Sequence, residues 1–371
     1  MAVYQPSKSY ADDKDVHDIL SSPKLSTKAL IALCRGRGIF LSEEGTREEL
    51  VHYASKLPFS WSQIQAVMAE VQRDDREEKL TTCKIAVGAN VDEVRQAIEQ
   101  VRDVRKDQMA EQYSITQGKD GRVQIKVNYT EPDFQRARLI QRREREVILE
   151  VEKKGDQYEV RHTQNERAND IITQILEQLT PPNSEQTPVR RTIELSGVRN
   201  HEHRTQFFVN LIGEMEGFQL REVRDLKVDH LENDSGAPAA SEEDEAKEKL
   251  ESEQLRSLVR KVALSGENIL ISPQYQQLAK DGFFISKAVW TSLETVGAGR
   301  LFEFEAEFRD AANAANFAYQ IRGVYNRNHD GEIEKTKSEL SESEKGVLKD
   351  CLEATAYGAV EKVNAMQPSA S

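Results

Sequence analysis

Residues 147–160 read VILEVEKKGDQYEV, and this stretch indicates which class of fold to expect. Two runs rich in β-branched and aromatic residues flank residues 153–156, a turn that contains Gly155. Such runs on either side of a glycine-containing turn are typical of a β-hairpin, whose two strands are antiparallel. The sequence therefore predicts antiparallel sheet near the middle of the chain.

Further strands and helices are predicted on both sides of this hairpin. In residues 302–308 apolar residues alternate with Glu303, Glu305 and Glu307, which predicts a strand with one buried side and one water-facing side. Residues 283–293 are its expected partner strand. Helical spacing of apolar residues, or a capping pattern, predicts helices over 61–80, 91–104, 133–143, 165–179, 200–215 and 343–366. We expect an α+β protein of several small mixed helix and antiparallel-sheet units, with a helical hairpin near the N-terminus.

Length and composition restrict the class of protein. The chain has 371 residues, a net charge of −13 and a mean hydropathy of −0.66, which fits two or three domains. It contains no apolar run of transmembrane length and no secretory signal pattern, so we expect no membrane partner. Cys34, Cys83 and Cys351 lie far apart, which favours free thiols in a reducing compartment, cytoplasmic or nuclear.

Negative charge is concentrated in residues 232–253, ENDSGAPAASEEDEAKEKLESE. This segment contains nine acidic residues and only two basic ones, Lys247 and Lys249. Low hydrophobicity of this kind is typical of a solvated linker. Prolines at 181, 182 and 188 mark a second break. The expected segments are a flexible tail (1–20), a helical module (21–60), an α+β unit (61–180), a strand–helix–strand unit packed with it (189–231), the acidic linker (232–253) and a C-terminal α+β unit (254–371).

Residues 25–57, LSTKALIALCRGRGIFLSEEGTREELVHYASKL, contain the most informative motif. Leu30, Leu33 and Cys34 are expected on one buried stripe of a first helix, which Gly36 and Gly38 end. Thr46 and Glu49 have the spacing of a capping box and begin a second helix. The segment is therefore expected to form two short helices joined by an extended loop.

This pattern resembles the SAP module, a helix–extended loop–helix unit that binds DNA. The matching features are Leu30, residues 37–39 (Arg-Gly-Ile), residues 45–47 (Gly-Thr-Arg) and residues 50–51 (Leu-Val). The resemblance implies DNA, or RNA, as a partner. It implies that phosphates contact the amides at the start of the second helix and the side chains of Lys28, Arg35, Arg37 and Arg47. The alternative is that the helical hairpin docks on protein.

A second set of arginines lies in residues 136–145. If this segment is helical, Arg138 and Arg142 share one face, and their guanidinium groups suit phosphate. The alternative interpretation is a solvated surface balanced by neighbouring glutamates. We include Arg138 and Arg142 among the expected nucleic-acid contacts.

An enzymatic alternative comes from Asp133, Glu152 and Lys154. Pro132-Asp133 followed by Glu152-Lys153-Lys154 has the spelling of PD-(D/E)xK nucleases, in which carboxylates hold Mg²⁺ and a lysine positions water. His201 and His203 lie two apart at a predicted helix start and do not share a face, so we predict no histidine metal site.

The function expected from the sequence is that of a non-catalytic nucleic-acid-binding adaptor without a cofactor. The N-terminal module would contact DNA phosphates while the α+β body binds an unidentified protein partner. Repair, chromosome maintenance and defence against foreign DNA are settings that use such proteins. The alternatives are the nuclease described above and a protein-interaction scaffold without nucleic-acid contact.

Overall fold

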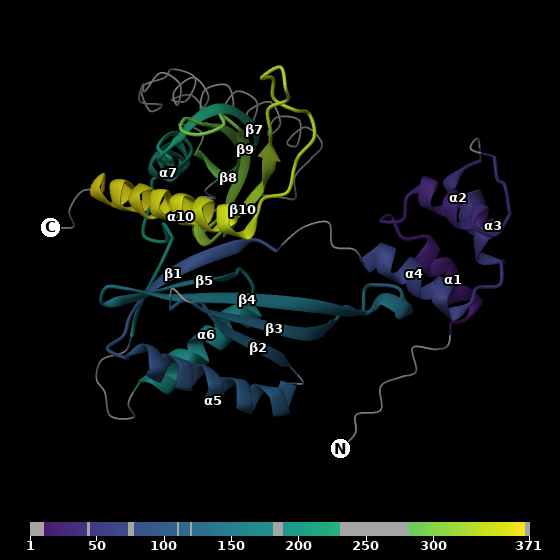
Figure 1. Ribbon diagram of the computed structural model, residues 1–371, viewed down its shortest axis with the longest axis horizontal. Coiled ribbons are helices and arrows are strands. Elements are labelled where there is room, and N and C mark those ends of the chain that lie inside the picture. Colours follow the sequence, from purple (N-terminus) through teal and green to yellow (C-terminus); the bar gives the residue numbers. More distant parts are fainter. Residues whose placement is uncertain are drawn as a thin grey trace. The chain divides into compact units, whose positions relative to one another are not determined.

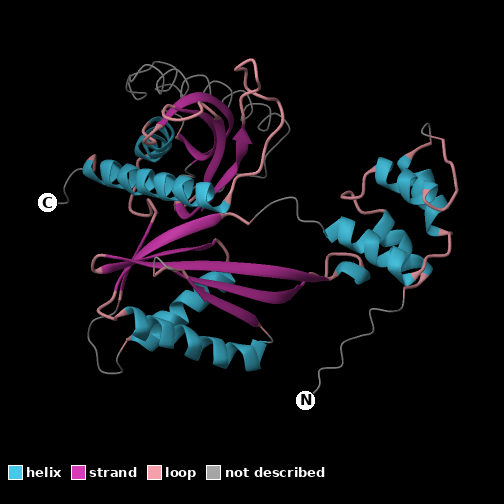
Figure 2. Cartoon of the chain, in the orientation of Figure 1, coloured by secondary structure: helices cyan, strands magenta, loops and turns pink. Residues whose placement is uncertain are grey.

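The computed structural model of this protein describes residues 11–42, 45–72, 78–109, 111–118, 121–180, 188–230 and 282–367. Figure 1 labels its helices and strands, and Figure 2 distinguishes them by colour. Contacts divide the chain into two compact units. The first comprises Met1–Glu77, Arg102–Ser114 and Lys126–Val147, and the second Glu78–Val101, Ile115–Ile125 and Ile148–Ser371. The predicted acidic linker at 232–253 lies outside the described residues.

The first unit is built mainly from four short helices that share one hydrophobic core. Its buried residues include Leu20, Leu30, Val51, Val67 and Ile140. The side chains of Asp12, Ser26 and Thr46 cap the first three helices, which explains where those helices begin. The helical elements that form this core are α1 (Asp13–Leu20), α2 (Thr27–Arg35), α3 (Arg47–Ser55), α4 (Trp61–Gln72) and the 3-10 turn η1 (Arg138–Ile140).

Two of the expected boundaries differ from this arrangement. The prediction of a flexible tail is wrong for residues 13–20, because α1 buries Ile19 and Leu20 in the core of the helical module. Helix α4 contributes Ile64, Val67 and Val71 to the same core, whereas the expected helical module ends at residue 60. Short polar helices of this kind are stabilised by tertiary packing, which their composition does not reveal.

The strands form an antiparallel sheet in the order β2-β3-β4-β5-β1-β10-β9-β8-β7, with β6 also paired to β1. Together with the helices this confirms the predicted α+β class. The strands are β1 (Leu80–Ala86), β2 (Gln112–Gln117), β3 (Val123–Pro132), β4 (Arg142–Lys154), β5 (Gln157–Thr163), β6 (Val189–Thr192), β7 (Phe218–His230), β8 (Phe283–Glu294), β9 (Leu301–Asp310) and β10 (Ala315–Tyr325).

The β-hairpin predicted over residues 147–160 is confirmed, and its first strand, β4, begins earlier than expected, at Arg142. β4 and β5 pair with Lys154 opposite Gln157, and Gly155 adopts the left-handed φ of 63° that the tight turn requires. The predicted helix over 133–143 is wrong: only η1 is helical, and β4 starts at Arg142. Every second residue of β4 faces the core: Val147, Leu149 and Val151 are buried, and the half-buried arginines before them continue the same alternation toward the N-terminal end of the strand. This two-residue period is that of a strand, which explains why the segment is not a helix.

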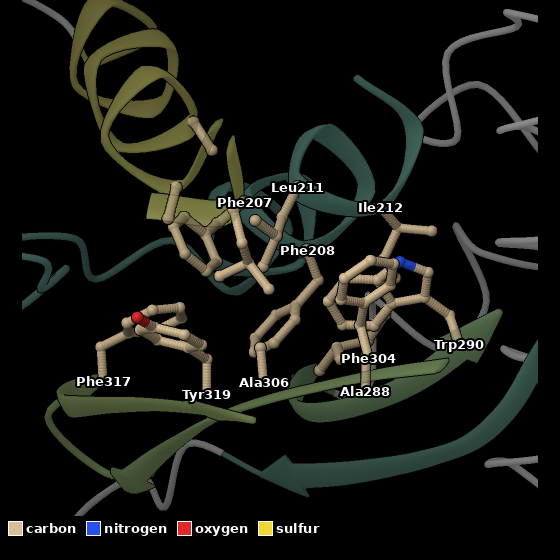
Figure 3. Packing of buried hydrophobic residues seen from close by; sticks show 14 of the residues in the cluster. Phe207, Phe208, Leu211, Ile212, Ala288, Trp290, Phe304, Ala306, Phe317 and Tyr319 are labelled. Carbon is tan, nitrogen blue, oxygen red and sulfur yellow. The ribbon is translucent and has the colours of Figure 1, made fainter. Parts of the chain in front are cut away.

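Helices cover the strands of the second unit in two groups. α5 (Val91–Met109) and α6 (Glu166–Leu179) lie against β1, β4 and β5, where apolar side chains such as Val94, Leu149 and Ile172 line the interface. α7 (His201–Gly213) and α10 (Glu342–Ala365) lie on one face of β7–β10. Figure 3 shows Phe207 and Phe208 of α7 directed at Phe304, Phe317 and neighbouring side chains of this sheet.

The other face of β9 does not face water as the alternation of its glutamates predicted. Glu303 and Glu305 are only 3% and 6% exposed. Glu303 accepts from Lys337 at 2.9 Å, and Glu305 accepts from Lys79 at 2.6 Å and from Lys287 at 2.9 Å. The carboxylates are buried because Lys79, Lys287 and Lys337, which come from separate parts of the chain, surround them, and no local pattern encodes this.

Candidate nucleic-acid interface

Helix α2 presents a narrow exposed stripe on the first unit. Its inner side is fixed by Leu30, Ile31 and Cys34, which are buried against the other helices. Lys28, Ala32 and Arg35 are exposed, and their spacing of four and three residues places them along one face.

The electrostatics of this stripe are uniformly positive. α2 contains no acidic residue. Within the part of the chain that the structure describes, neither Lys28 nor Arg35 forms an ion pair or a side-chain hydrogen bond. Arg35 also lies in the last helical turn, where a cation is favourable beside the carbonyl end of the helix. Both charges are therefore available to an external anion.

Arg37 and Arg47, in contrast, are used inside the module. Arg37 donates to the carbonyl of Pro58 at 2.6 Å and lies 4.2 Å from the centre of the Phe59 ring, so it holds the α3–α4 connection. Arg47 donates to the carbonyl of Ser22 at 2.7 Å and to that of Leu25 at 2.5 Å. These two arginines position loops, and the structure does not present them beside Lys28 and Arg35.

Arg138 and Arg142 are likewise not brought onto a common helical face, because they belong to η1 and β4. Arg138 Nε donates to Asp15 Oδ1 at 2.8 Å, and this contact lowers the pKa of the Asp15 carboxyl. Arg142 is exposed, and its backbone carbonyl accepts from Gln72 Nε2 at 3.0 Å. Arg138 thus ties the η1 turn to α1 within the first unit.

The amides at the start of α3 are less open than the resemblance implies. The capping box is formed: Glu49 N donates to Thr46 Oγ1 at 3.3 Å, and Thr46 N donates to Glu49 Oε2 at 3.0 Å. Glu48 and Glu49 also place two carboxylates in the first turn. These carboxylates repel a phosphate at the N-terminus of α3. Of the two candidate anion sites, the exposed face of α2 is therefore the better one.

The three residues of the nuclease alternative each have a structural contact. Asp133 pairs with Arg136 at 2.8 Å, Glu152 with Arg122 at 2.8 Å, and Lys154 Nζ lies 2.6 Å from a carboxylate oxygen of Glu159. No group of three or more histidine, cysteine or acidic side chains is arranged to hold a metal ion among the residues described. The nuclease alternative stays a prediction without a metal-ligand cluster to support it.

Two exposed aromatic residues of the first unit were not singled out from the sequence. Phe40, in the loop after α2, is 81% exposed, and Phe134, in the loop after β3, is 80% exposed. Their exposure was predictable from the sequence, because each aromatic residue follows a glycine- or proline-containing segment and is not part of a helical or strand-like apolar pattern. Exposed rings near cations are the components of base-stacking surfaces.

The comparisons with known proteins do not assign this chain to a class. No family model matches it, and no curated protein is significantly similar to it. No helix in the described ranges has the combined length and apolarity needed to cross a membrane. The resemblance of residues 25–57 to the SAP module therefore stays a prediction.

The contrast between Arg47 and Arg35 gives a test of these assignments. Arg47→Ala is expected to destabilise the helical module by about 1.5–3 kcal/mol, because it removes a charged donor and leaves carbonyls of the α1–α2 loop without it. Arg35→Ala is expected to change stability by less than about 0.5 kcal/mol, as for an exposed site. Hydrogen exchange of α1 and α2 amides in the full-length protein measures both, and equal protection in the two variants would contradict the structural role of Arg47.

Proposed function

We propose that this protein is a nucleic-acid-binding accessory protein whose N-terminal helical module contacts phosphates through α2. The observation that carries the proposal is the exposed stripe Lys28–Ala32–Arg35, on a helix without acidic residues. The phosphate backbone is a regular array of anions, and a pair of solvated cations two helical turns apart can contact it without disturbing the fold. Arg37, Arg47 and Arg138 support this surface by holding the surrounding loops.

Fluorescence anisotropy of labelled DNA and RNA, titrated with the full-length protein, tests the proposal. We expect binding that weakens between about 50 mM and about 200 mM salt, since neutralised phosphates release counterions. The double variant Lys28→Ala/Arg35→Ala is expected to bind about tenfold more weakly at low salt and to reduce the salt slope by about 2.

The matched control is Lys153→Ala/Lys335→Ala, which makes the same change in net charge at exposed positions of the second unit. This control is expected to bind as the parent protein does. Equal losses in the two double variants would show that net charge alone matters and would refute the role of α2. No binding at low salt would leave the module as a protein-docking element.

A further inference from the structure

A pocket of about 390 Å³ opens in the first unit close to the start of α2. One wall is the end of α1 and the α1–α2 loop, including Asp18, Ser21 and Lys24. Residues 135–137 form a second wall, and Val71 and Ile140, which are nearly inaccessible to solvent, contribute apolar lining. The volume lies in the range of pockets that hold small organic groups.

The loop that forms the second wall is fixed by its own hydrogen bonds. Asp133 N donates to the carbonyl of Gln141 at 2.6 Å, and Ile140 N donates to that of Ala137 at 2.8 Å. Gln135 N donates to Asp133 Oδ1 at 3.2 Å. Phe134 is thereby held in an ordered turn with its ring in solvent, directly before the pocket wall.

Both walls are also braced by arginines from elsewhere in the unit. Arg47 binds the carbonyls of Ser22 and Leu25 in the α1–α2 loop, and Arg138 pairs with Asp15 of α1. The pocket shape is thus held by contacts present before any ligand arrives, which lowers the entropy cost of binding.

The lining has the chemistry of a planar, polar-edged ring attached to an anion. Pro23 and Ala137 add apolar lining beside the buried Val71 and Ile140. Asp18 accepts from Lys14 at 3.0 Å, and Ser21 Oγ donates to the His17 carbonyl at 2.8 Å, which leaves acceptor positions on both side chains for the edge of a ring. Arg136, held by Asp133 at 2.8 Å, and Lys24 add positive charge to the rim. Lys24 lies in the turn before α2, and Lys28 is exposed in the first turn of that helix, so both cations belong to the same short segment of the chain.

We propose that this pocket receives one unstacked base of a single-stranded nucleic acid, with Phe134 stacking against a neighbouring base. This inference rests on the proposed function and adds that the preferred ligand is single-stranded. Bases of an intact duplex are stacked and paired, so they reach such a pocket only at the cost of being flipped out. A free strand has no such cost.

The test compares two labelled strands of equal charge, each titrated with the full-length protein. One is an oligothymidylate of about ten nucleotides, and the other is an abasic strand with the same number of phosphates. We expect the oligothymidylate to bind about tenfold more tightly, because base stacking on protein aromatic rings is lost in the abasic strand. Duplex with the same total number of phosphates is expected to bind like the abasic strand.

Variants test whether the preference for the oligothymidylate over the abasic strand arises at the pocket. Phe134→Ala and Ser21→Leu, which places an apolar, non-aromatic side chain in the pocket from an exposed position, are each expected to remove most of the tenfold difference. Tyr53→Ala, at a partly exposed ring on α3, is expected to leave it unchanged. Equal binding of the two strands, or a preference that survives both pocket variants, would overturn the pocket assignment and leave the proposed function standing. No binding of either strand or of duplex at low salt would overturn both.

Discussion

Replacing Arg161 by methionine is expected to lower the free energy of unfolding of the second unit by about 3–5 kcal/mol. Arg161 of β5 is 7% exposed and is paired with three carboxylates, of which Glu353 is buried and Asp350 is 43% exposed. Its Nε lies 2.7 Å from Glu353 Oε1, its Nη2 lies 2.6 Å from Asp350 Oδ1, and its Nη1 lies 3.0 Å from Glu150 Oε2. Removing the cation leaves Glu353, which is 6% exposed, without its compensating charge.

Urea unfolding followed by Trp290 fluorescence in a Trp61→Phe background measures this loss. The matched control is Arg191→Met, which removes an arginine that is 50% exposed and paired with Glu361 at 2.9 Å. The control is expected to cost less than about 1 kcal/mol, as exposed ion pairs do. Burial raises the pKa of Glu353, so Arg161→Met/Glu353→Gln is expected to recover part of the loss. A smaller loss in the free energy of unfolding for Arg161→Met than for Arg191→Met would contradict the stabilising role of the Arg161 ion pairs.

His162 is expected to make the protein less stable as the pH falls from about 6.5 to about 4. Its ring is fully buried, with Nδ1 2.9 Å from the carbonyl of Thr163 and Nε2 3.4 Å from Arg190 Nη2. Burial, with help from the Arg190 charge, lowers the pKa of His162 to about 4. The unfolded chain therefore takes up a proton in this window while the folded protein does not, which costs about 3 kcal/mol over the whole window.

The measurement is the free energy of unfolding at neutral pH and at about pH 4.5, for the parent and for His162→Gln. The parent is expected to lose about 2–3 kcal/mol more than the variant over this interval. Titration of carboxylates is common to both proteins and cancels in the comparison. His52→Gln, at an exposed position of α3, is expected to behave as the parent. Parallel losses in the parent and His162→Gln would refute a buried, neutral His162.

Elements with a strong local signal were predicted well. The hairpin of β4 and β5 follows from a glycine turn between β-branched runs, and α7 begins where Asn200 accepts a hydrogen bond from Glu202 N. α6 begins in the same way at Asn165. In each case the residues that decide the structure lie within a few positions of each other.

Errors arose where two interpretations of a segment had similar local support. Residues 133–143 combine a proline turn with charged residues that fit either a helix or a strand, and pairing in the sheet decided for β4. For the candidate interface, the sequence identified the basic residues of the module. It could not distinguish Lys28 and Arg35, which are exposed, from Arg37 and Arg47, which hold loops.

The sequence by itself determined the α+β class, the helix caps, the antiparallel hairpin and the position of a basic helix near the N-terminus. These depend on periodicity and on contacts between neighbours in the chain. Only the tertiary structure decided which charges are buried and which are available to a ligand. Arg138 meets Asp15 across 123 residues, and Arg161 meets Glu353 across 192. Whether an arginine is exposed or forms an ion pair depends on residues that folding brings next to it. These residues are distant in the sequence, so local sequence patterns do not identify them.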